Sequence, residues 1–315
     1  MSMHMRRSPW PVLALAVITI ATVACSPRRV MINQVGRIID AGQPAYEQET
    51  DLYLLSHAFP SHVKLLEGLS VSDPRNTELL VLIARLYAGY AFAVLETESE
   101  ALRYGQPPVI GLGLTRENLE KEVSHCFQTG AAFALKALAC KYPDIRDHLG
   151  QAGSAVAYFD TLAPADVPAL FWYGFNLAGF VLHNLQSVSA MSRAYQVESA
   201  MRRVIALDPT YYYASAHLVL LAYYAARPPM MGGNPELARQ HYNQHRLLIP
   251  QPMRLRELYW ARYHLVQQQE RTAFTRALTE LSAEVSPESR FPLLDSVAAK
   301  RAAVYLNAAD HFFDD

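Results

Sequence analysis

Cysteine is scarce in this sequence, which excludes a fold stapled by disulfides. Three cysteines occur in 315 residues, and only Cys126 and Cys140 lie beyond the N-terminal region. They belong to one predicted helix, on which 14 residues of separation correspond to roughly 21 Å. A disulfide needs the two α-carbons within about 7 Å. We therefore expect both cysteines to be small buried hydrophobic residues.

An excess of one charge is also missing, and this excludes a nucleic-acid surface. Lys and Arg total 28 while Asp and Glu total 29, which gives a formal net charge of −1. Nucleic-acid binding needs clustered Lys and Arg, and the sequence contains no such cluster. We expect no nucleic-acid partner.

Catalytic motifs are incomplete where they occur. Gly111-Leu-Gly113 resembles part of a dinucleotide loop, but the third glycine and a preceding strand are missing. His241 and His245 are spaced to chelate a metal, yet Tyr242 occupies the position where the zinc-protease pattern has Glu. The sequence has no serine nucleophile elbow and no paired carboxylates in an apolar setting. We expect a protein that is not an enzyme and uses no metal or cofactor.

We interpret the most apolar internal stretch as too short to cross a membrane. The most apolar internal stretch, 169–185, has about fifteen apolar residues and includes Asn176 and His183, whereas a membrane helix needs about 20. A buried central helix is the better interpretation. Alternation of the kind that marks strands persists nowhere, so we predict an all-α protein.

The N-terminal region resembles a secretory signal. A short basic segment precedes an apolar run at 10–24, which ends in small residues before Cys25. That ending is similar to a bacterial lipobox, in which the cysteine is lipidated; an ordinary signal peptide cut nearby is the alternative. Because no Asp follows Cys25, we place the anchor in the inner leaflet of the outer membrane. The predicted divisions are 1–24 (lipoprotein signal peptide), 25–31 (tether) and 32–315 (a single tetratricopeptide-like helical domain).

One spacing of inward-facing residues recurs four times along the chain. An inward residue is followed by others four and seven positions later, and by a proline twelve positions after the first. This is the second helix of a tetratricopeptide repeat, so we predict a degenerate tetratricopeptide-like α-solenoid of stacked helix pairs. The four sets are His62, Leu66, Leu69, Pro74; Ala131, Leu135, Leu138, Pro143; Val197, Met201, Val204, Pro209; and Ala238, Tyr242, His245, Pro250.

Helix limits follow from caps and prolines. Pro60 should separate two helices, Thr115 should cap a long one, and Pro292 should open a final helix that caps the exposed end of the stack. The predicted helices are 46–58, 61–69, 76–99, 115–141, 147–157, 169–185, 196–207, 210–226, 235–249, 253–268, 272–284 and 292–312.

Aromatic residues are concentrated in two predicted helices. Tyr211, Tyr212 and Tyr213 are consecutive on a helix, so they cannot all face one core, and Tyr223 and Tyr224 repeat the pattern. Such side chains suit a surface that is apolar on one side and wet or bound on the other. Our hypothesis for residues that line a ligand or partner groove is Trp172, Tyr173, Asn176, Tyr212, Tyr223, Met230 and Met231.

The loop 227–234 is too long and too apolar for a plain connector. Its two methionines suit an adaptable contact surface. Gly232 and Gly233 permit backbone angles that other residues avoid. Asn234 should cap the following helix, with Pro235 in its first turn.

At this point the motifs indicate a family. Cys25, the degenerate repeats, LDPxY at 207–211 and GGNPExAxxxY at 232–242 resemble the T-component (TatT) lipoproteins of TRAP transporters. The resemblance implies a lipid-anchored periplasmic accessory protein, able to form a homotrimer with a central pore. It also implies docking of the transporter's substrate-binding protein and relay of an apolar ligand without chemistry.

Two other functions stay open at this level. A generic tetratricopeptide scaffold for envelope assembly would share the anchor and the repeats. A metal-dependent periplasmic hydrolase would use His241 and His245. The sequence identifies no ligand.

Overall fold

The computed structural model describes residues 27–313, and within that range it contains helices and no strand. The all-α prediction is therefore confirmed. The predicted signal peptide and the Cys25 lipidation site lie outside the described residues.

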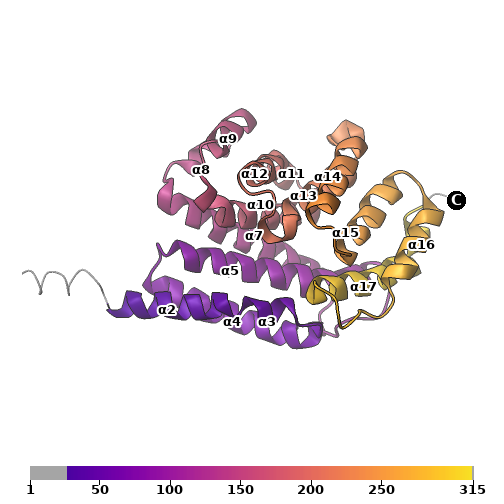
Figure 1. Cartoon of the computed structure of the whole chain (residues 1–315), viewed down its shortest axis with the longest axis horizontal. Coiled ribbons are helices and arrows are strands. Elements are labelled where there is room, and N and C mark those ends of the chain that lie inside the picture. Colours follow the sequence, from indigo (N-terminus) through magenta and orange to yellow (C-terminus); the bar gives the residue numbers. More distant parts are fainter. Residues whose placement is uncertain (1–26, 314–315) are drawn as a thin grey trace, which may run out of the picture.

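The N-terminal helices form the lower layer of the molecule in Figure 1. Asn76 begins the longest apolar segment of this layer, because its side chain accepts a hydrogen bond from the Leu79 N–H (3.0 Å). The elements are α2 (Pro27–Ala41), α3 (Gln43–Glu47), α4 (Leu52–Ser72), α5 (Thr77–Gly89), the π-helix η1 (Tyr90–Leu95) and α6 (Glu96–Arg103).

The middle of the chain forms the upper layer, with α7 and α10 next to α5 (Figure 1). Thr115 caps α7 as predicted, since its hydroxyl accepts from the Asn118 N–H (3.3 Å). The elements are α7 (Arg116–Lys141), α8 (Ile145–His148), α9 (Ala152–Phe159), the 3-10 helix η2 (Pro164–Asp166), α10 (Val167–Leu182), α11 (Val188–Met191), α12 (Ala194–Leu207) and α13 (Tyr211–Ala225).

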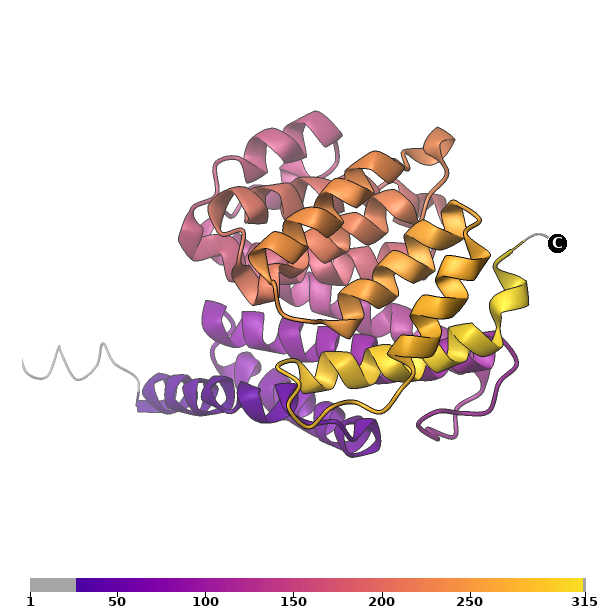
Figure 2. The same ribbon diagram turned by 45° about the vertical axis from the view of Figure 1, so that its right-hand side comes forward.

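The last long helix of the chain, α17, returns to the lower layer (Figure 1). Figure 2 shows α17 running beside the N-terminal helices, and Arg301 on α17 donates to Thr97 Oγ1 (3.0 Å) on α6. The predicted final helix does begin at Pro292, and besides packing on α15 and α16 it contacts α6 near the other end of the chain. The elements are the 3-10 helix η3 (Pro229–Met231), α14 (Pro235–Leu248), α15 (Arg254–Tyr259), the π-helix η4 (Trp260–Leu265), α16 (Arg271–Leu281), α17 (Pro292–Asn307) and the 3-10 helix η5 (Ala309–His311).

Helix α10 is the central helix of the core. It packs on α5, α7, α12 and α13, and most of its residues are buried. Two described helical segments, 77–103 and 164–182, are long and apolar enough to cross a membrane. Both are mostly buried inside the protein, which is the expected result for core helices.

The recurring template marks buried positions in most of its copies. In the second, third and fourth sets every inward residue is buried except Tyr242, which is half-buried. In the first set Leu66 is buried, while His62 and Leu69 are half-buried. The spacing therefore locates helix faces correctly, although α17 departs from the open-ended stack that a solenoid implies.

The predicted helix end at Pro60 is wrong, because α4 continues through it. An interior proline costs about 3 kcal/mol. Leu55 and Phe59 before it and Val63 and Leu66 after it are all buried. Each large apolar side chain contributes roughly 1.5–3 kcal/mol on burial, so the continuous stripe outweighs the lost hydrogen bond.

The predicted helix 147–157 is also wrong, because it is interrupted. Gln151 is extended (φ −134°, ψ 134°) between α8 and α9. Gly150 precedes it, and glycine disfavours a continuous helix. The break lets Ile145 and Phe159, which lie on either side of it, both enter the core.

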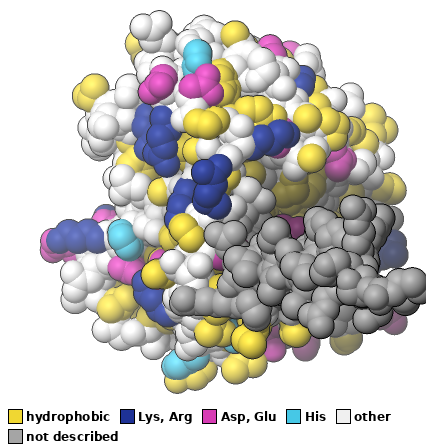
Figure 3. Space-filling model, turned by 90° about the vertical axis from the view of Figure 1, so that its left-hand side faces the viewer, with side chains coloured by type: hydrophobic (Ala, Val, Ile, Leu, Met, Phe, Trp, Pro, Cys, Tyr) yellow, Lys and Arg dark blue, Asp and Glu magenta, His cyan; other side chains and the backbone are white. Residues whose placement is uncertain are grey.

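Figure 3 shows the face of the molecule at which α2 begins. Lys and Arg side chains lie there in small groups among hydrophobic and acidic ones. The described part of this face therefore carries no continuous basic field of the kind that attracts a phosphate backbone.

The loop that resembles part of a dinucleotide site binds a carboxylate of the chain itself. Glu98 on α6 is 2% exposed. Its Oε2 accepts from the N–H groups of Val109 (2.8 Å) and Ile110 (2.7 Å). Its Oε1 accepts from those of Gly111 (2.9 Å) and Leu112 (3.0 Å). The backbone N–H groups of this loop form an anion nest, and Glu98 fills it.

We predict that Glu98→Gln lowers the free energy of unfolding by about 2–3 kcal/mol, because an amide cannot accept from four N–H groups and buried donors then lose their partners. Urea denaturation followed by circular dichroism measures the change. Glu288→Gln, at an exposed position, is the matched control. Equal stability of the two variants would contradict the role of the nest.

Candidate functional site

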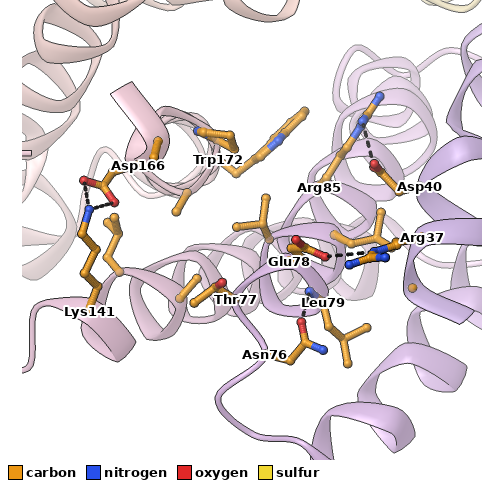
Figure 4. Close-up of a pocket in the computed structure, with 18 of the residues that line it drawn as sticks. Arg37, Asp40, Asn76, Thr77, Glu78, Leu79, Arg85, Lys141, Asp166 and Trp172 are labelled. Atoms are coloured by element: carbon orange, nitrogen blue, oxygen red, sulfur yellow. Dashed lines mark hydrogen bonds and ion pairs between the residues drawn. The ribbon is translucent and has the colours of Figure 1, made fainter. Parts of the chain in front are cut away.

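A groove of about 550 Å³ opens between α2, α5, α7 and α10 (Figure 4). We call it the outer groove. Its volume lies within the usual range for ligand pockets, about 300–1,000 Å³. Trp172 and Tyr211 supply aromatic surface, and the charged residues in its lining are Arg37, Asp40, Glu78, Arg85, Lys141 and Asp166.

Cations and anions of the outer groove are paired. Arg37 Nε lies 4.0 Å from Glu78 Oε2, and Lys141 Nζ lies 2.9 Å from Asp166 Oδ1. Figure 4 draws these pairs on opposite sides of the groove. Tyr142 also donates to Asp166 (2.6 Å). Although burial raises the pKa of Asp166, its hydrogen bonds from Tyr142 and Lys141 bring it below the usual value, so the groove is electrically balanced.

A smaller cavity of about 60 Å³ lies behind the outer groove. We call it the middle chamber. Arg85 and Trp172 line both spaces, so they form the wall between them. The lining of the middle chamber is mostly apolar and includes Phe59, Leu86, Phe92, Phe175, Leu218, Val219, Leu255, Tyr259, Leu293 and Leu294.

The wall is a stack of one cation and two aromatic rings. The guanidinium carbon of Arg85 lies 5.8 Å from the ring centroid of Trp172 and 5.3 Å from that of Tyr212. The Trp172 and Tyr212 rings meet edge to face with centroids 4.8 Å apart. Cation–π contacts at such distances are attractive. Burial raises the pKa of Tyr212 to about 12, with Arg85 acting in the opposite direction.

Tyr212 is held in the wall by an unusual backbone. Tyr212, Tyr213 and Ala214 all have left-handed angles, with φ of 45°, 58° and 54°. The prediction that the three tyrosines lie on one regular helix is therefore wrong. Left-handed non-glycine residues cost roughly 1–2 kcal/mol each. The turn is secured because the Tyr213 hydroxyl donates to Glu47 Oε2 (2.6 Å) and His245 Nε2 bonds the Tyr213 carbonyl (3.0 Å).

A third cavity, of about 80 Å³, continues from the middle chamber. We call it the far chamber. Four residues line both chambers: Phe92, Phe175, Val219 and Tyr259. The rings of Phe92 and Phe175 meet edge to face with centroids 6.0 Å apart, which makes them the constriction between the two spaces.

Both π-helical segments border the chambers. Phe92 belongs to η1 and Tyr263 to η4, and Tyr259 immediately precedes η4. A π-helical turn rotates the side chains that follow it relative to an α-helix, and such turns are frequent at functional sites. Here the rings of Phe92, Tyr259 and Tyr263 line the chambers.

The far chamber has one charged wall. Glu96 Oε2 accepts from Arg301 (3.1 Å), and Glu96 Oε1 lies 3.2 Å from His183 Nε2. Burial raises the pKa of Glu96, but Arg301 and His183 outweigh it and bring the pKa to about 2. Glu96 is therefore a paired, ionised carboxylate.

The far chamber reaches the surface beside the double-glycine loop. Its rim includes Tyr223, Arg227 and the 42% exposed Leu185. The Arg227 guanidinium lies 3.7 Å from the centre of the Tyr223 ring and donates to the Gly232 carbonyl (3.3 Å). The loop thus fixes the position of a rim residue.

The sequence also matches known proteins. The model of the TRAP transporter T-component family matches residues 48–313. This chain belongs to the TRAP transporter T-component family. It is also 26% identical over 196 residues to an uncharacterized protein of Treponema pallidum (strain Nichols), a match that covers 61% of this chain and 58% of that protein. The chain thus spans less than two thirds of that relative.

Family membership determines the broad role. A T-component is an accessory part of a transport system that works outside the cytoplasm.

Three of the predicted groove residues line these cavities in the T-component. Trp172 and Tyr212 lie in the wall of the middle chamber, and Tyr223 lies at the rim of the far chamber. Two others belong to the core, which corrects their assignment to a groove. Tyr173 is wholly buried and donates to Gln196 Oε1 (2.6 Å), and Asn176 is wholly buried at the junction of α5, α7 and α10.

The two glycines and the asparagine of the loop 227–234 have structural roles, which their backbone geometry and hydrogen bonds explain. Gly232 is left-handed (φ 85°), and a Cβ on Gly233 would lie 1.7 Å from the Arg227 carbonyl oxygen. Asn234 caps α14 as predicted, accepting from the Leu237 N–H (3.0 Å). Met230 and Met231, on η3 at the tip of the loop, are 91% and 51% exposed and line none of the three cavities.

Sequence reasoning missed several cavity residues. Arg85 could have been identified from the sequence, because it is the single charged residue in the apolar run 79–95. Phe92, Phe175 and Tyr259 could not have been identified, because aromatic residues packed in an ordinary core show the same spacing along a helix.

The two histidines of the hydrolase hypothesis have separate partners. His241 Nδ1 lies 2.9 Å from His217 Nδ1, while His245 bonds the Tyr213 carbonyl. Among the described residues, no group of three metal-ligating side chains converges. Burial lowers the pKa of His217, His241 and His245 to about 4, so they are neutral packing residues at neutral pH.

We predict that Gly130→Ala destabilises this T-component by about 1–3 kcal/mol through overpacking. A Cβ on Gly130 would lie 2.3 Å from Asn176 Oδ1, while the Asn176 amide donates to the Ala84 (3.1 Å) and Trp172 (2.8 Å) carbonyls. Urea denaturation measures the loss. The control is Gly153→Ala on α9, where a Cβ meets nothing within 4 Å and helix propensity predicts a gain of about 0.5–1 kcal/mol. A gain in both variants would refute the packing argument.

We also predict that stability falls as the pH decreases from 6.5 toward 4. In this window the unfolded histidines, with ordinary pKa of 6.5, take up protons, while folded His217, His241 and His245 stay neutral until about pH 4. Urea midpoints across the window measure the slope. His217→Gln should flatten it, and His57→Gln, at an exposed position on α4, should not. An unchanged slope in His217→Gln would contradict the assignment.

Proposed function

We propose that this protein is a lipid-anchored periplasmic T-component that binds an apolar small molecule and passes it between the outer groove and the far-chamber rim. The observation that carries the proposal is the shared walls. Arg85 and Trp172 join the outer groove to the middle chamber, and Phe92 and Phe175 join the middle chamber to the far one. The three spaces thus form one row across the protein.

The chemistry of the lining supports an apolar ligand. At the chambers Arg85 is paired with Glu47 (2.5 Å) and Glu96 with Arg301 (3.1 Å), and the Arg227 guanidinium at the rim lies over the Tyr223 ring. The remaining surface is largely aromatic and aliphatic, so apolar contact supplies the binding energy.

The small volumes of the two chambers imply that side chains move when a ligand enters. At about 60 and 80 Å³ each is smaller than the roughly 300 Å³ at which ligand pockets begin. Entry of a ligand therefore requires rotation of the Phe92 and Phe175 rings, or of Tyr212 in the wall. A left-handed turn that stores strain suits such a change.

The surroundings of the rim suit a protein partner. Leu185, which lines the far chamber, is 42% exposed, and Val188 and Met230, on the segments that follow Leu185 and Arg227, are 85% and 91% exposed; a continuous apolar surface around them would suit a protein partner. We propose that the substrate-binding protein of a TRAP transporter docks at the rim. Acylation of Cys25 would hold the protein at the inner leaflet of the outer membrane, and assembly as a homotrimer belongs to the same proposal.

Filling the far chamber tests the proposal. Ala222 lines that chamber alone, so Ala222→Phe should occupy it and weaken binding of the apolar fluorophore N-phenylnaphthylamine by about tenfold or more, equivalent to about 1.4 kcal/mol. Fluorescence titration measures the affinity. Ala132→Phe, at an exposed position on α7, is the control. Unchanged binding in Ala222→Phe, with an unchanged melting temperature, would refute transit through the far chamber.

A further inference from the structure

The geometry points to a hydrogen-bonding site in the middle chamber: we propose that the Gln43 side-chain amide binds a neutral acceptor oxygen on the ligand. The inference rests on the proposed function and specifies its ligand class. That class is an elongated apolar molecule carrying one uncharged carbonyl group, as in a ketone, an ester or an amide.

Gln43 is the polar residue without a partner in this chamber. It stands at the first position of α3, is 5% exposed and lines the middle chamber. Its Nε2 is fully buried and makes no hydrogen bond. A buried amide donor without an acceptor costs about 1–3 kcal/mol, and buried polar groups in native proteins almost always have a partner. A ligand oxygen in the chamber would supply the missing acceptor.

The charges around the chamber disfavour an anionic ligand. Arg85 is the only cation among the residues that line the chamber. Its Nη2 donates to Glu47 Oε1 (2.5 Å), and its Nη1 lies 3.9 Å from Asp40 Oδ1. Two carboxylates therefore accompany one guanidinium, and Glu47 itself faces the chamber. A carboxylate on the ligand would add like charge at short range, which is unfavourable in a poorly solvated site.

The rest of the chamber specifies an apolar body for the ligand. The aromatic rings of Phe59, Trp172 and Phe175 form much of the wall. The Phe92–Phe175 constriction leads to the far chamber. A molecule whose carbonyl lies at Gln43 would therefore extend its apolar chain through this constriction.

Competition between ligands of equal length tests the inference. Bound N-phenylnaphthylamine is displaced from the purified full chain by a straight-chain methyl ketone, by the alkane of the same length and, at mildly alkaline pH, by the fatty acid of the same length. We expect the ketone to compete at a concentration about tenfold lower than the alkane, because one buried hydrogen bond separates them. The ionised fatty acid should compete less well than the ketone.

Gln43→Leu should remove the advantage of the ketone over the alkane and leave displacement by the alkane unchanged. It should not lower the melting temperature, since it removes a buried donor that has no partner in the protein. Gln48→Leu, at an exposed position just after α3, is the matched control and should retain the advantage.

Each contrary result has a defined meaning. Equal competition by ketone and alkane in the wild type would overturn the inference, and so would stronger competition by the fatty acid. Persistence of the ketone advantage in Gln43→Leu would also overturn it, because the acceptor would then bind elsewhere. In all three cases the proposed function stands as long as the fluorophore binds, and it fails separately if Ala222→Phe leaves that binding intact.

Discussion

The close packing of α10 against its neighbours is the constraint on which the rest of the structure depends. Gly174 and Gly179 lie where Met201 of α12 and Phe127 of α7 approach the helix, and a Cβ would meet those side chains at 2.7 Å and 2.6 Å. Small residues at these contacts let two helices approach the same central helix from different sides. Three aromatic residues of α10 lie toward the cavities: Phe171 and Trp172 contact Tyr211 and Tyr212 of α13, and Phe175 contacts Phe92 of η1.

Buried ion pairs connect parts of the chain that are distant in sequence. Arg301 on α17 donates to Glu96 and to Thr97 on α6, across about two hundred residues. Breaking such a pair leaves an uncompensated buried charge, so the contact position is strongly specified. The Arg301–Glu96 pair thereby holds the C-terminal helix α17 against the N-terminal helix α6. The chambers are then enclosed by helices from both halves of the chain, since Leu293 of α17 and Phe59 of α4 line the same space.

The site combines a rigid frame with few mobile parts. Its helices are fixed by core packing, whereas its walls consist of single side chains: Arg85, Trp172 and Tyr212 on one side, Phe92 and Phe175 on the other. Rotation of aromatic rings is much less costly than separation of helices. In the proposed function, rotation of these side chains would admit and release a ligand without unfolding the protein.

The sequence by itself determined most of the helices and several of their inward faces. Periodicity located the buried stripes of α7, α12 and α14, and local hydrogen bonding located the caps at Thr115 and Asn234, because both signals arise from residues a few positions apart. The motifs at 207–211 and 232–242 were sufficient for the family. Tertiary structure alone decided that α4 runs through Pro60, that α17 returns to α6, and that residues 212–214 turn left-handed. It alone placed Gln43 in a chamber with Phe92 and Tyr259. Those features depend on which faces meet across the chain, and a local pattern contains no information about its distant neighbour.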